Sequence, residues 1–197
     1  MRSILLAAAV VLGGASASMA QAQEAFQGDA AFTYHYVRTN AAPGECGCFG
    51  LNGAGISGSW NVRGGWSAVT EFSSEYTSKA TPGNSSLTLT TFLAGARYRL
   101  PSSWLHRVQG ARRVQPFAQV LLGGGHSGGG VAGVGDATYA FAARMGGGVD
   151  VPVSSRFAVR GQIDYFPTLF ANAKNDRQNN MLLGAGIVYQ WSWSRSK

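Results

Sequence analysis

Along eight segments of this sequence, large apolar side chains alternate with small or charged ones at every second position. A β-strand places successive side chains on opposite faces, whereas a helix repeats every 3.6 residues and would scatter the charges around its axis. Each segment reaches the roughly 9 to 11 residues that a transmembrane strand needs. The predicted strands are Asp29–Arg38, Asn52–Val62, Trp66–Tyr76, Leu87–Arg99, Val114–Gly124, Tyr139–Val151, Phe157–Phe166 and Met181–Trp191. The pattern therefore predicts an all-β protein.

In most of these segments, the charged residues share one face and the large apolar residues share the other. In Phe157–Phe166, for example, Val159 and Ile163 alternate with Arg160 and Asp164. Strict alternation of this kind is typical of a strand whose two faces meet different surroundings.

Two segments fit the alternation less well. Leu87 and Leu89 lie on the charged face of their segment, and Gln119 shares a face with Phe117 and Leu121. The sequence leaves open which way the apolar side chains of these two segments point.

The connections between the predicted strands alternate in length. Loops follow the first, third, fifth and seventh strands, at Thr39–Leu51, Thr77–Ser86, Gly125–Thr138 and Pro167–Asn180. Tight turns follow the second and sixth strands, at Arg63–Gly65 and Ser154–Arg156, and only Pro101–Arg113 is long in this second set. Outer-membrane barrels have long loops outside the cell and short turns on the periplasmic side. An even number of strands then places both termini in the periplasm.

The apolar faces hold too many large side chains to fit inside a small barrel. Eight strands enclose only enough room for side chains to fill. We therefore expect the aromatic and aliphatic residues to face lipid, with glycines, serines and paired charges filling the lumen. Closure also satisfies every backbone N–H and C=O group, as a bilayer requires. The prediction is a closed antiparallel up-and-down transmembrane β-barrel of about eight strands, and a soluble β-sandwich is the alternative.

Residues 1–22 have the order of a secretory signal peptide. Arg2 supplies a positive charge, an apolar run begins at Ile4, and small residues lead to two cleavage sites, after Ala20 and after Ala22. The apolar run is well short of the roughly 20 residues of a membrane-spanning helix. We expect cleavage, with Ala22 slightly preferred, to leave residues 23–197 as a single domain. A retained, buried N-terminal helix is the alternative.

The charge composition also suits a lipid-facing barrel. Charged residues make up 13% of the chain, about half the usual share of a soluble domain. The net charge of +7 raises the question of whether the protein binds nucleic acid. The basic residues are scattered, however, and the densest group lies in one connecting segment. That group is Arg99, Arg107, Arg112 and Arg113. We therefore predict no nucleic-acid partner.

From Pro116 to Trp191 the chain resembles the outer-membrane β-barrel family that includes the OmpA-type transmembrane domains. The resemblance is carried by Pro116–Ala118, Gly146–Val151, Phe157–Arg160, Asp164–Tyr165 and Gly184–Trp191, with Thr91–Tyr98 further upstream. It implies an exported protein of the Gram-negative outer membrane. No peptidoglycan-binding domain follows, so the cell-wall tether of longer family members is not implied.

The final strand is similar to the C-terminal signal that the barrel-assembly machinery reads. Ile187, Tyr189 and Trp191 supply apolar and aromatic side chains at alternate positions. The resemblance therefore implies that this machinery is a partner during biogenesis. Six residues follow Trp191, whereas the family usually ends on the aromatic residue.

The charges on the inner face form the main candidate site. They must be paired, because an unpaired charge buried in a narrow barrel costs several kcal/mol. The predicted interior network consists of Glu71, Glu75, Arg97, Arg99, Arg144, Asp150, Arg160 and Asp164. We interpret this network as structural, and a rearrangement that gates a small pore is the alternative.

Cys46 and Cys48 are the only cysteines. An oxidising periplasm favours a disulfide between them, although a single intervening residue makes a strained ring. An intermolecular link and a soft-metal site are the alternatives. Zinc prefers four ligands, and the three histidines, His35, His106 and His126, lie on separate segments. We predict a loop disulfide, with no metal and no cofactor.

Two short motifs point to catalysis, but their context does not support it. Gly125–Gly129 has the G-x-S-x-G spacing of a nucleophile elbow, which requires a strand-to-helix turn in an α/β-hydrolase. Gly128–Gly133 matches G-x-G-x-x-G, but no helix start follows it to receive a pyrophosphate. We therefore predict no catalytic residue, while His126 and Ser127 keep a lipid-modifying barrel enzyme open as an alternative.

The leading functional hypothesis is a non-enzymatic outer-membrane barrel whose four loops carry a structural or surface-interaction role. A narrow, low-conductance pore is the first alternative, and the lipid-modifying enzyme is the second. The expected partners are outer-membrane lipid, the assembly machinery and a loop ligand that the sequence does not identify.

Overall fold

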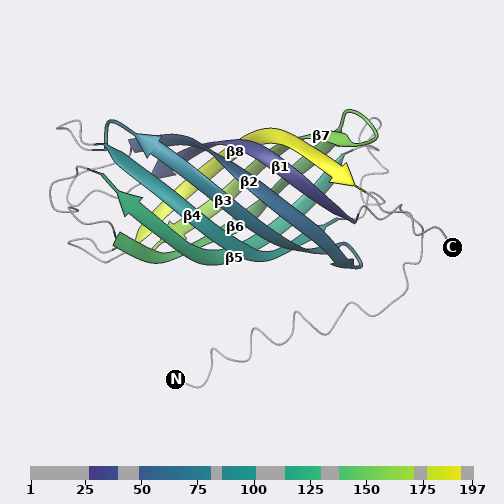
Figure 1. The fold of residues 1–197 in the computed structure, drawn as a ribbon, viewed down its shortest axis with the longest axis horizontal. Helices are drawn as coiled ribbons and strands as arrows, with labels where there is room; N and C mark the ends of the chain where they lie inside the picture. The colour runs from purple at the N-terminus through teal and green to yellow at the C-terminus, as the bar shows by residue number, and fades with distance from the viewer. Residues whose placement is uncertain are drawn as a thin grey trace, which may run out of the picture.

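The computed structural model describes residues 27–39, 49–80, 86–100, 114–129, 138–170 and 177–191. Its strands are β1 (Gly28–Thr39), β2 (Phe49–Arg63), β3 (Trp66–Thr77), β4 (Leu87–Arg99), β5 (Gln115–Gly128), β6 (Thr138–Pro152), β7 (Phe157–Thr168) and β8 (Gln178–Trp191). Each strand pairs antiparallel with the next, and β8 pairs with β1 to close the barrel (Figure 1). The predicted closed up-and-down barrel is confirmed. Among the described residues, no helix is long and apolar enough to cross a membrane.

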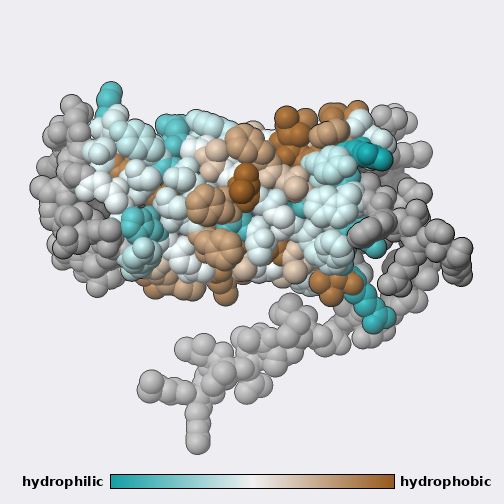
Figure 2. Space-filling model, in the orientation of Figure 1, coloured by the Kyte–Doolittle hydropathy of each residue, from teal (hydrophilic) through white to brown (hydrophobic). Residues whose placement is uncertain are grey.

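The alternation in sequence becomes an alternation between the wall and the interior. On β7, Val159 and Ile163 are about half exposed on the outer wall, whereas Arg160 and Asp164 are completely or almost completely buried. Figure 2 shows apolar side chains spread over the outer wall of the barrel. The ionised faces therefore point inward, as the pattern predicts.

The strands are strongly tilted against the barrel axis (Figure 1). Following the paired residues from Gly28 through every strand returns to β1 at Arg38, near the other end of the same strand. Barrel closure requires this stagger, which sets the barrel's radius for a given strand number. Residues far apart in sequence are thereby brought to the same level of a narrow interior.

Two tight turns, the start of β1 and the end of β8 lie at one end of the barrel, here called the turn end. Between β2 and β3, Gly64 and Gly65 have φ angles of 59° and 86°. A type I′ hairpin turn needs positive φ at both central positions, which glycine adopts without steric cost. Between β6 and β7, the Ser154 hydroxyl accepts a hydrogen bond from the Phe157 amide at 3.1 Å. Both turns were predicted, and the opposite end is here called the loop end.

Several strands extend further toward the loop end than the side-chain pattern predicts. β5 continues to Gly128, β2 already begins at Phe49, and β8 begins at Gln178. The antiparallel ladder continues there through backbone pairs such as Thr90 with His126. Backbone hydrogen bonds do not depend on side-chain alternation, so a glycine-rich stretch can pair without showing the pattern.

The interior contains an apolar cluster. The sequence pattern predicts a lumen filled by glycine, serine and charged residues, so this cluster departs from the prediction. Its members are Val37, Leu51, Val69, Leu89, Leu93, Leu121, Ala142, Phe166 and Leu182. Leu51 and Leu89 are each the third residue from the loop end of their strands, so the cluster reaches toward that end. An interior that is filled by side chains does not require them to be polar. The apolar residues that broke the alternation in the fourth and fifth segments therefore point inward.

Aromatic side chains ring the outer wall near both ends. Toward the turn end, Trp66 packs on Tyr98 at 4.9 Å between ring centroids, and Phe157 packs on Tyr189 at 5.3 Å. The outward-facing tyrosines toward the loop end are Tyr34, Tyr36, Tyr76, Tyr139 and Tyr165. Two aromatic girdles that enclose an apolar band are the arrangement of a barrel in a bilayer.

Candidate functional site

All eight residues of the predicted interior network point into the barrel. Glu71, Glu75, Arg97, Arg144, Asp150, Arg160 and Asp164 are each less than 5% exposed. Arg99, nearest the turn end, keeps 14% of its side chain exposed. These side chains form two clusters, and amide side chains link the one at the turn end to Asp164.

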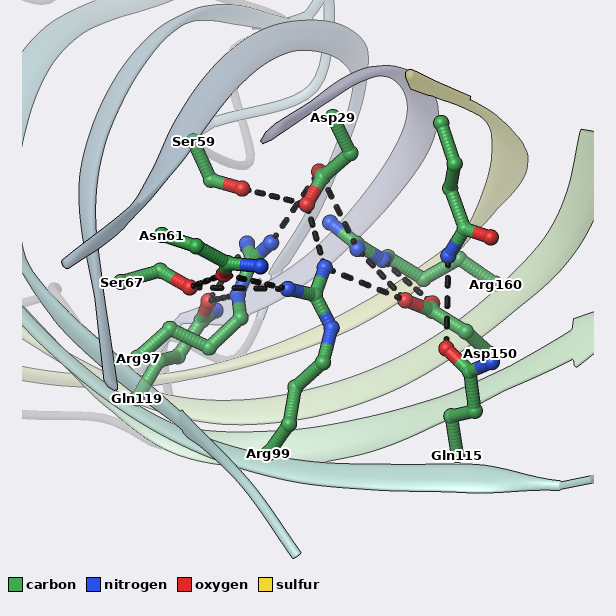
Figure 3. A network of polar contacts seen from close by, with 11 residues as sticks. Asp29, Ser59, Asn61, Ser67, Arg97, Arg99, Gln115, Gln119, Asp150 and Arg160 are labelled. Carbon is green, nitrogen blue, oxygen red and sulfur yellow. Dashed lines mark hydrogen bonds and ion pairs between the residues drawn. The ribbon is translucent and has the colours of Figure 1, made fainter. Parts of the chain in front are cut away.

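The cluster at the turn end is centred on Asp29, which the sequence analysis did not include. Asp29 accepts hydrogen bonds from Arg99 and from the Ser59 hydroxyl (Figure 3). Its Oδ1 atom also lies 3.4 Å from Nη1 of Arg97 and 3.6 Å from Nη2 of Arg160. One carboxylate from the first strand therefore neutralises guanidinium groups from β4 and β7.

Asp150 forms the second anionic centre of this cluster. It accepts two parallel hydrogen bonds from Arg160, from Nε at 2.7 Å and from Nη2 at 2.8 Å (Figure 3). Paired hydrogen bonds of this kind fix the guanidinium plane as well as its charge. The guanidinium groups of Arg160 and Arg97 each lie 4.8 Å from the ring centroid of Phe117, which supplies a cation–π surface.

Two glutamines connect this cluster with the middle of the barrel. The Gln119 side-chain oxygen accepts hydrogen bonds from Arg97 at 3.2 and 3.0 Å. Its amide nitrogen donates to Asp164 at 3.2 Å, and Gln162 donates to the same carboxylate at 3.1 Å. Among the residues that the structure describes, Asp164 is thus held by amide donors rather than by a direct ion pair.

The second cluster is centred on Arg144 of β6. Arg144 donates to Glu71 and, at 3.1 Å, to the Ser73 hydroxyl. Its Nη2 atom lies 3.6 Å from Glu75, and its guanidinium lies 4.7 Å from the centroid of Phe166. The cation therefore bridges β6 to β3 across the lumen, beside members of the apolar cluster.

A hydroxyl, an imidazole and a carboxylate lie in a row beside Arg144. The Thr33 hydroxyl is 2.7 Å from Nε2 of His35, and Nδ1 of His35 is 2.9 Å from Glu75. Gly55 leaves space for the ring, since a Cβ atom there would lie 2.5 Å from Cε1 of His35. Activated nucleophiles use the same order of groups. Here each of the three side chains is at most 3% exposed, so the row can hold a proton but offers no access to a substrate.

His126 and Ser127, the pair that kept a barrel enzyme open, project to opposite faces of β5. Ser127 is buried on the inner face, while the His126 ring packs against Tyr139 with 4.8 Å between centroids. Adjacent residues of a strand cannot act on one group together. Within the described strands, no three His, Cys, Asp or Glu side chains lie close enough to hold a metal ion.

A comparison of the sequence with protein-family models identifies its family. The model described as outer membrane protein beta-barrel domain matches residues 7–188. The chain belongs to this family. A comparison with curated protein sequences found no match.

Solved structures of outer-membrane barrels have the same fold. Neisserial surface protein A gives a TM-score of 0.65 at 13% identity, covering 84% of this chain and 97% of that one. The N-terminal β-barrel domain of Pseudomonas aeruginosa OprF gives 0.51 at 12% identity, with coverages of 83% and 97%. AlkL, solved in DMPC lipid bilayers, gives 0.50 at 9% identity, with coverages of 92% and 97%. At such low identities the likeness shows the fold alone.

In this outer-membrane barrel, the residues of the expected assembly signal lie on the strand that closes the sheet. Ile187 and Tyr189 face outward on β8, and the strand ends at Trp191, whose ring centroid is 6.3 Å from that of Tyr189. The cysteines Cys46 and Cys48, like residues 1–22 with their expected signal peptide, lie outside the described residues.

The network of this outer-membrane barrel includes partners that sequence reasoning missed. Asp29 and His35 stand on the inward face of the first segment, opposite Phe32 and Tyr34. Their parity could have indicated this, since a polar residue on the inward face of a closed barrel needs a partner. Gln119 was noted only as a misfit, although it links Arg97 to Asp164.

Proposed function

We propose that this outer-membrane barrel is a non-enzymatic membrane anchor, and that the four connections at its loop end carry a structural or surface-interaction role. The observation that carries the proposal is the filled interior. Arg97, Arg144 and Arg160 are fully or almost fully buried with their anionic partners, and the apolar cluster packs beside them and reaches Leu51 and Leu89 near the loop end. A filled barrel contributes rigidity and leaves recognition to its connections.

The side-chain geometry also supports a role without catalysis. The row of Thr33, His35 and Glu75 is sealed inside the barrel, and His126 is separated from Ser127 by the sheet itself. Catalysis needs a nucleophile and a base that meet at an accessible position. Neither the buried row of Thr33, His35 and Glu75 nor the pair of His126 and Ser127 meets that condition.

A narrow pore is the second candidate, and one observation favours it. Glu75 Oε2, Arg144 Nε and Arg160 Nη1 are buried and have no hydrogen-bond partner among the described residues. A network that is incompletely satisfied is one that can rearrange, because unmade hydrogen bonds weaken its preference for a single arrangement.

The same proposal includes the route by which the protein is exported and assembled. Residues 1–22 would direct export and be removed, after Ala20 or Ala22. The assembly machinery would then recognise the alternating side chains of β8 that end at Trp191. In the oxidising periplasm, Cys46 and Cys48 would form a disulfide within the first loop.

Planar-bilayer recording distinguishes the anchor from the pore. We expect the purified, refolded protein to give no stepwise conductance at 100 mV in 1 M KCl. Regular channel events would contradict the anchor and support the second candidate.

Loop replacement tests the surface role. Cells that express the intact chain are compared with cells in which residues 81–85 and 171–176 are replaced by glycine–serine linkers of equal length. We expect both barrels to show the same heat-dependent shift in SDS electrophoresis. Only the intact chain should confer attachment to a panel of immobilised polysaccharides and matrix proteins. Equal attachment, or none by either strain, would contradict a loop-borne interaction.

A further inference from the structure

A polar pocket of about 560 Å³ opens where β1, β2 and β3 reach the loop end. We call it the rim pocket, and its lining includes Arg38, Gly50, Asn52, Tyr76 and Lys79. This volume is within the range of small-ligand sites, about 300 to 1,000 Å³. The rim pocket lies outside the interior network described above.

The described lining of the rim pocket is positively charged. Arg38 and Lys79 belong to it, and none of the lining residues that the structure describes is a carboxylate. Neither cation forms an ion pair with any residue that the structure describes, in contrast to the interior guanidinium groups. Two unpaired cations beside hydroxyl and amide groups are suited to an anion with several oxygens, such as a phosphate.

Local contacts shape the pocket before any ligand arrives. The Tyr34 hydroxyl donates to Oδ1 of Asn52 at 2.5 Å, which leaves the Asn52 amide group as a donor. A Cβ atom at position 50 would lie 2.8 Å from the Tyr36 ring, so only glycine allows that ring to pack there. The Thr77 hydroxyl accepts from the Lys79 amide at 3.2 Å and holds the chain that carries this lysine.

An apolar groove lies on the same three strands, toward the turn end. Ala30, Gly58 and Thr70 are neighbours across the sheet and form a row of small residues. The adjacent row toward the loop end contains the large side chains of Phe32, Ile56 and Phe72, and residues of both rows line a hollow of about 730 Å³. We call this hollow the acyl groove, and it lies on the outer wall among exposed apolar side chains.

The two features together point to a lipid as the occupant. The rim pocket lies at the level of the outer tyrosines, where headgroups meet a barrel wall. A soluble anion would use the cations alone, whereas a phosphorylated lipid would place its phosphate at Arg38 and Lys79 and an acyl chain in the groove. We propose that β1, β2 and β3 bind a phosphorylated glycolipid of the outer leaflet in this way.

Lipid A is the probe for the test, since it carries phosphates on an acylated sugar. The refolded protein is titrated with lipid A in phosphatidylcholine nanodiscs, and the bound lipid is counted by native mass spectrometry. The R38Q/K79Q variant should bind about 25-fold more weakly, because each basic residue near an anionic membrane surface contributes about a factor of five. The matched control, R63Q/R156Q, removes two exposed arginines at the turn end and should bind as wild type does.

The groove and the source of the phosphate are tested separately. The T70L variant fills the small-residue row and should release lipid A several-fold faster, whereas A118L, on the outer wall of β5, should not. Inorganic phosphate at 10 mM should not displace lipid A. Equal binding by R38Q/K79Q and wild type, equal binding of dephosphorylated lipid A, or displacement by inorganic phosphate would each overturn the proposal. A heat-dependent shift in SDS electrophoresis confirms that each variant folds.

Discussion

At the residue scale, the interior depends on charges that are buried only because each has a partner. Arg144 is completely buried, and Glu71, Glu75 and Ser73 surround its guanidinium. Removing one member of such a pair leaves the other as an uncompensated charge, which costs more than the pair contributes when intact. The network is therefore most sensitive to single substitutions.

Arg144→Met should destabilise the barrel by about 3 to 5 kcal/mol, because Glu71 then lacks its cation. Urea unfolding in phospholipid vesicles, followed by tryptophan fluorescence, measures the loss. The double variant E71Q/R144M should recover at least 1 kcal/mol, since it leaves no lone charge at this pair. The control, Arg156→Met, changes an exposed arginine and should shift stability by less than about 0.5 kcal/mol. Equal stability of R144M and R156M would contradict the pairing.

Gly55→Ala should displace the His35 ring, because the new Cβ atom would lie 2.5 Å from Cε1. A loss of about 1 to 3 kcal/mol is the usual cost of overpacking. The His35 ring ¹⁵N resonances should shift as the contacts with Thr33 and Glu75 open. Gly161→Ala is the matched control, since nothing lies within 4 Å of a Cβ atom there. Unchanged His35 resonances in G55A would show that the ring does not occupy this space.

At the element scale, each strand could be predicted because its two faces meet different surroundings. On β7, the alternation of Val159 and Ile163 with Arg160 and Asp164 gave both the strand and the direction of its side chains. On β4 and β5 the rule was insufficient, since Leu89 and Leu121 are apolar and point inward. Parity assigns a side chain to a face, but it does not show which residues lie across the lumen.

Tyr189→Ala should reduce the amount of assembled barrel in the outer membrane several-fold, because Tyr189 belongs to the proposed signal on β8. Refolding of the purified variant into detergent should change little, since the lost contact with Phe157 contributes only about 0.5 to 1.5 kcal/mol. Leu183→Ala, on the same face of the same strand, serves as the control. Equal membrane levels of the two variants would argue against a role of Tyr189 in assembly.

At the scale of the whole molecule, closure and stagger create the contacts that sequence reasoning could not supply. Asp29 contacts Arg97, which is 68 positions away in sequence, and Arg144 contacts Glu71, which is 73 positions away. These pairings depend on the register of every intervening strand, and a shift of one residue would turn each side chain to the opposite face. The eight predicted network residues shared an inward parity, but their partners required the closed structure.

The barrel's place in a membrane depends on the orientation of its strands, whose apolar faces contact lipid while their ionised faces fill the lumen. Spin-label accessibility along β7 tests it most directly, after Cys46 and Cys48 have been replaced by serine. A nitroxide is placed in turn at Ala158, Val159, Gln162 and Ile163 of the protein in lipid nanodiscs, and its collision rate with dissolved oxygen is measured. Labels at Val159 and Ile163 should be highly accessible to oxygen, which concentrates in hydrocarbon, while labels at Ala158 and Gln162 should be shielded. The reverse alternation, or no alternation, would contradict the claim.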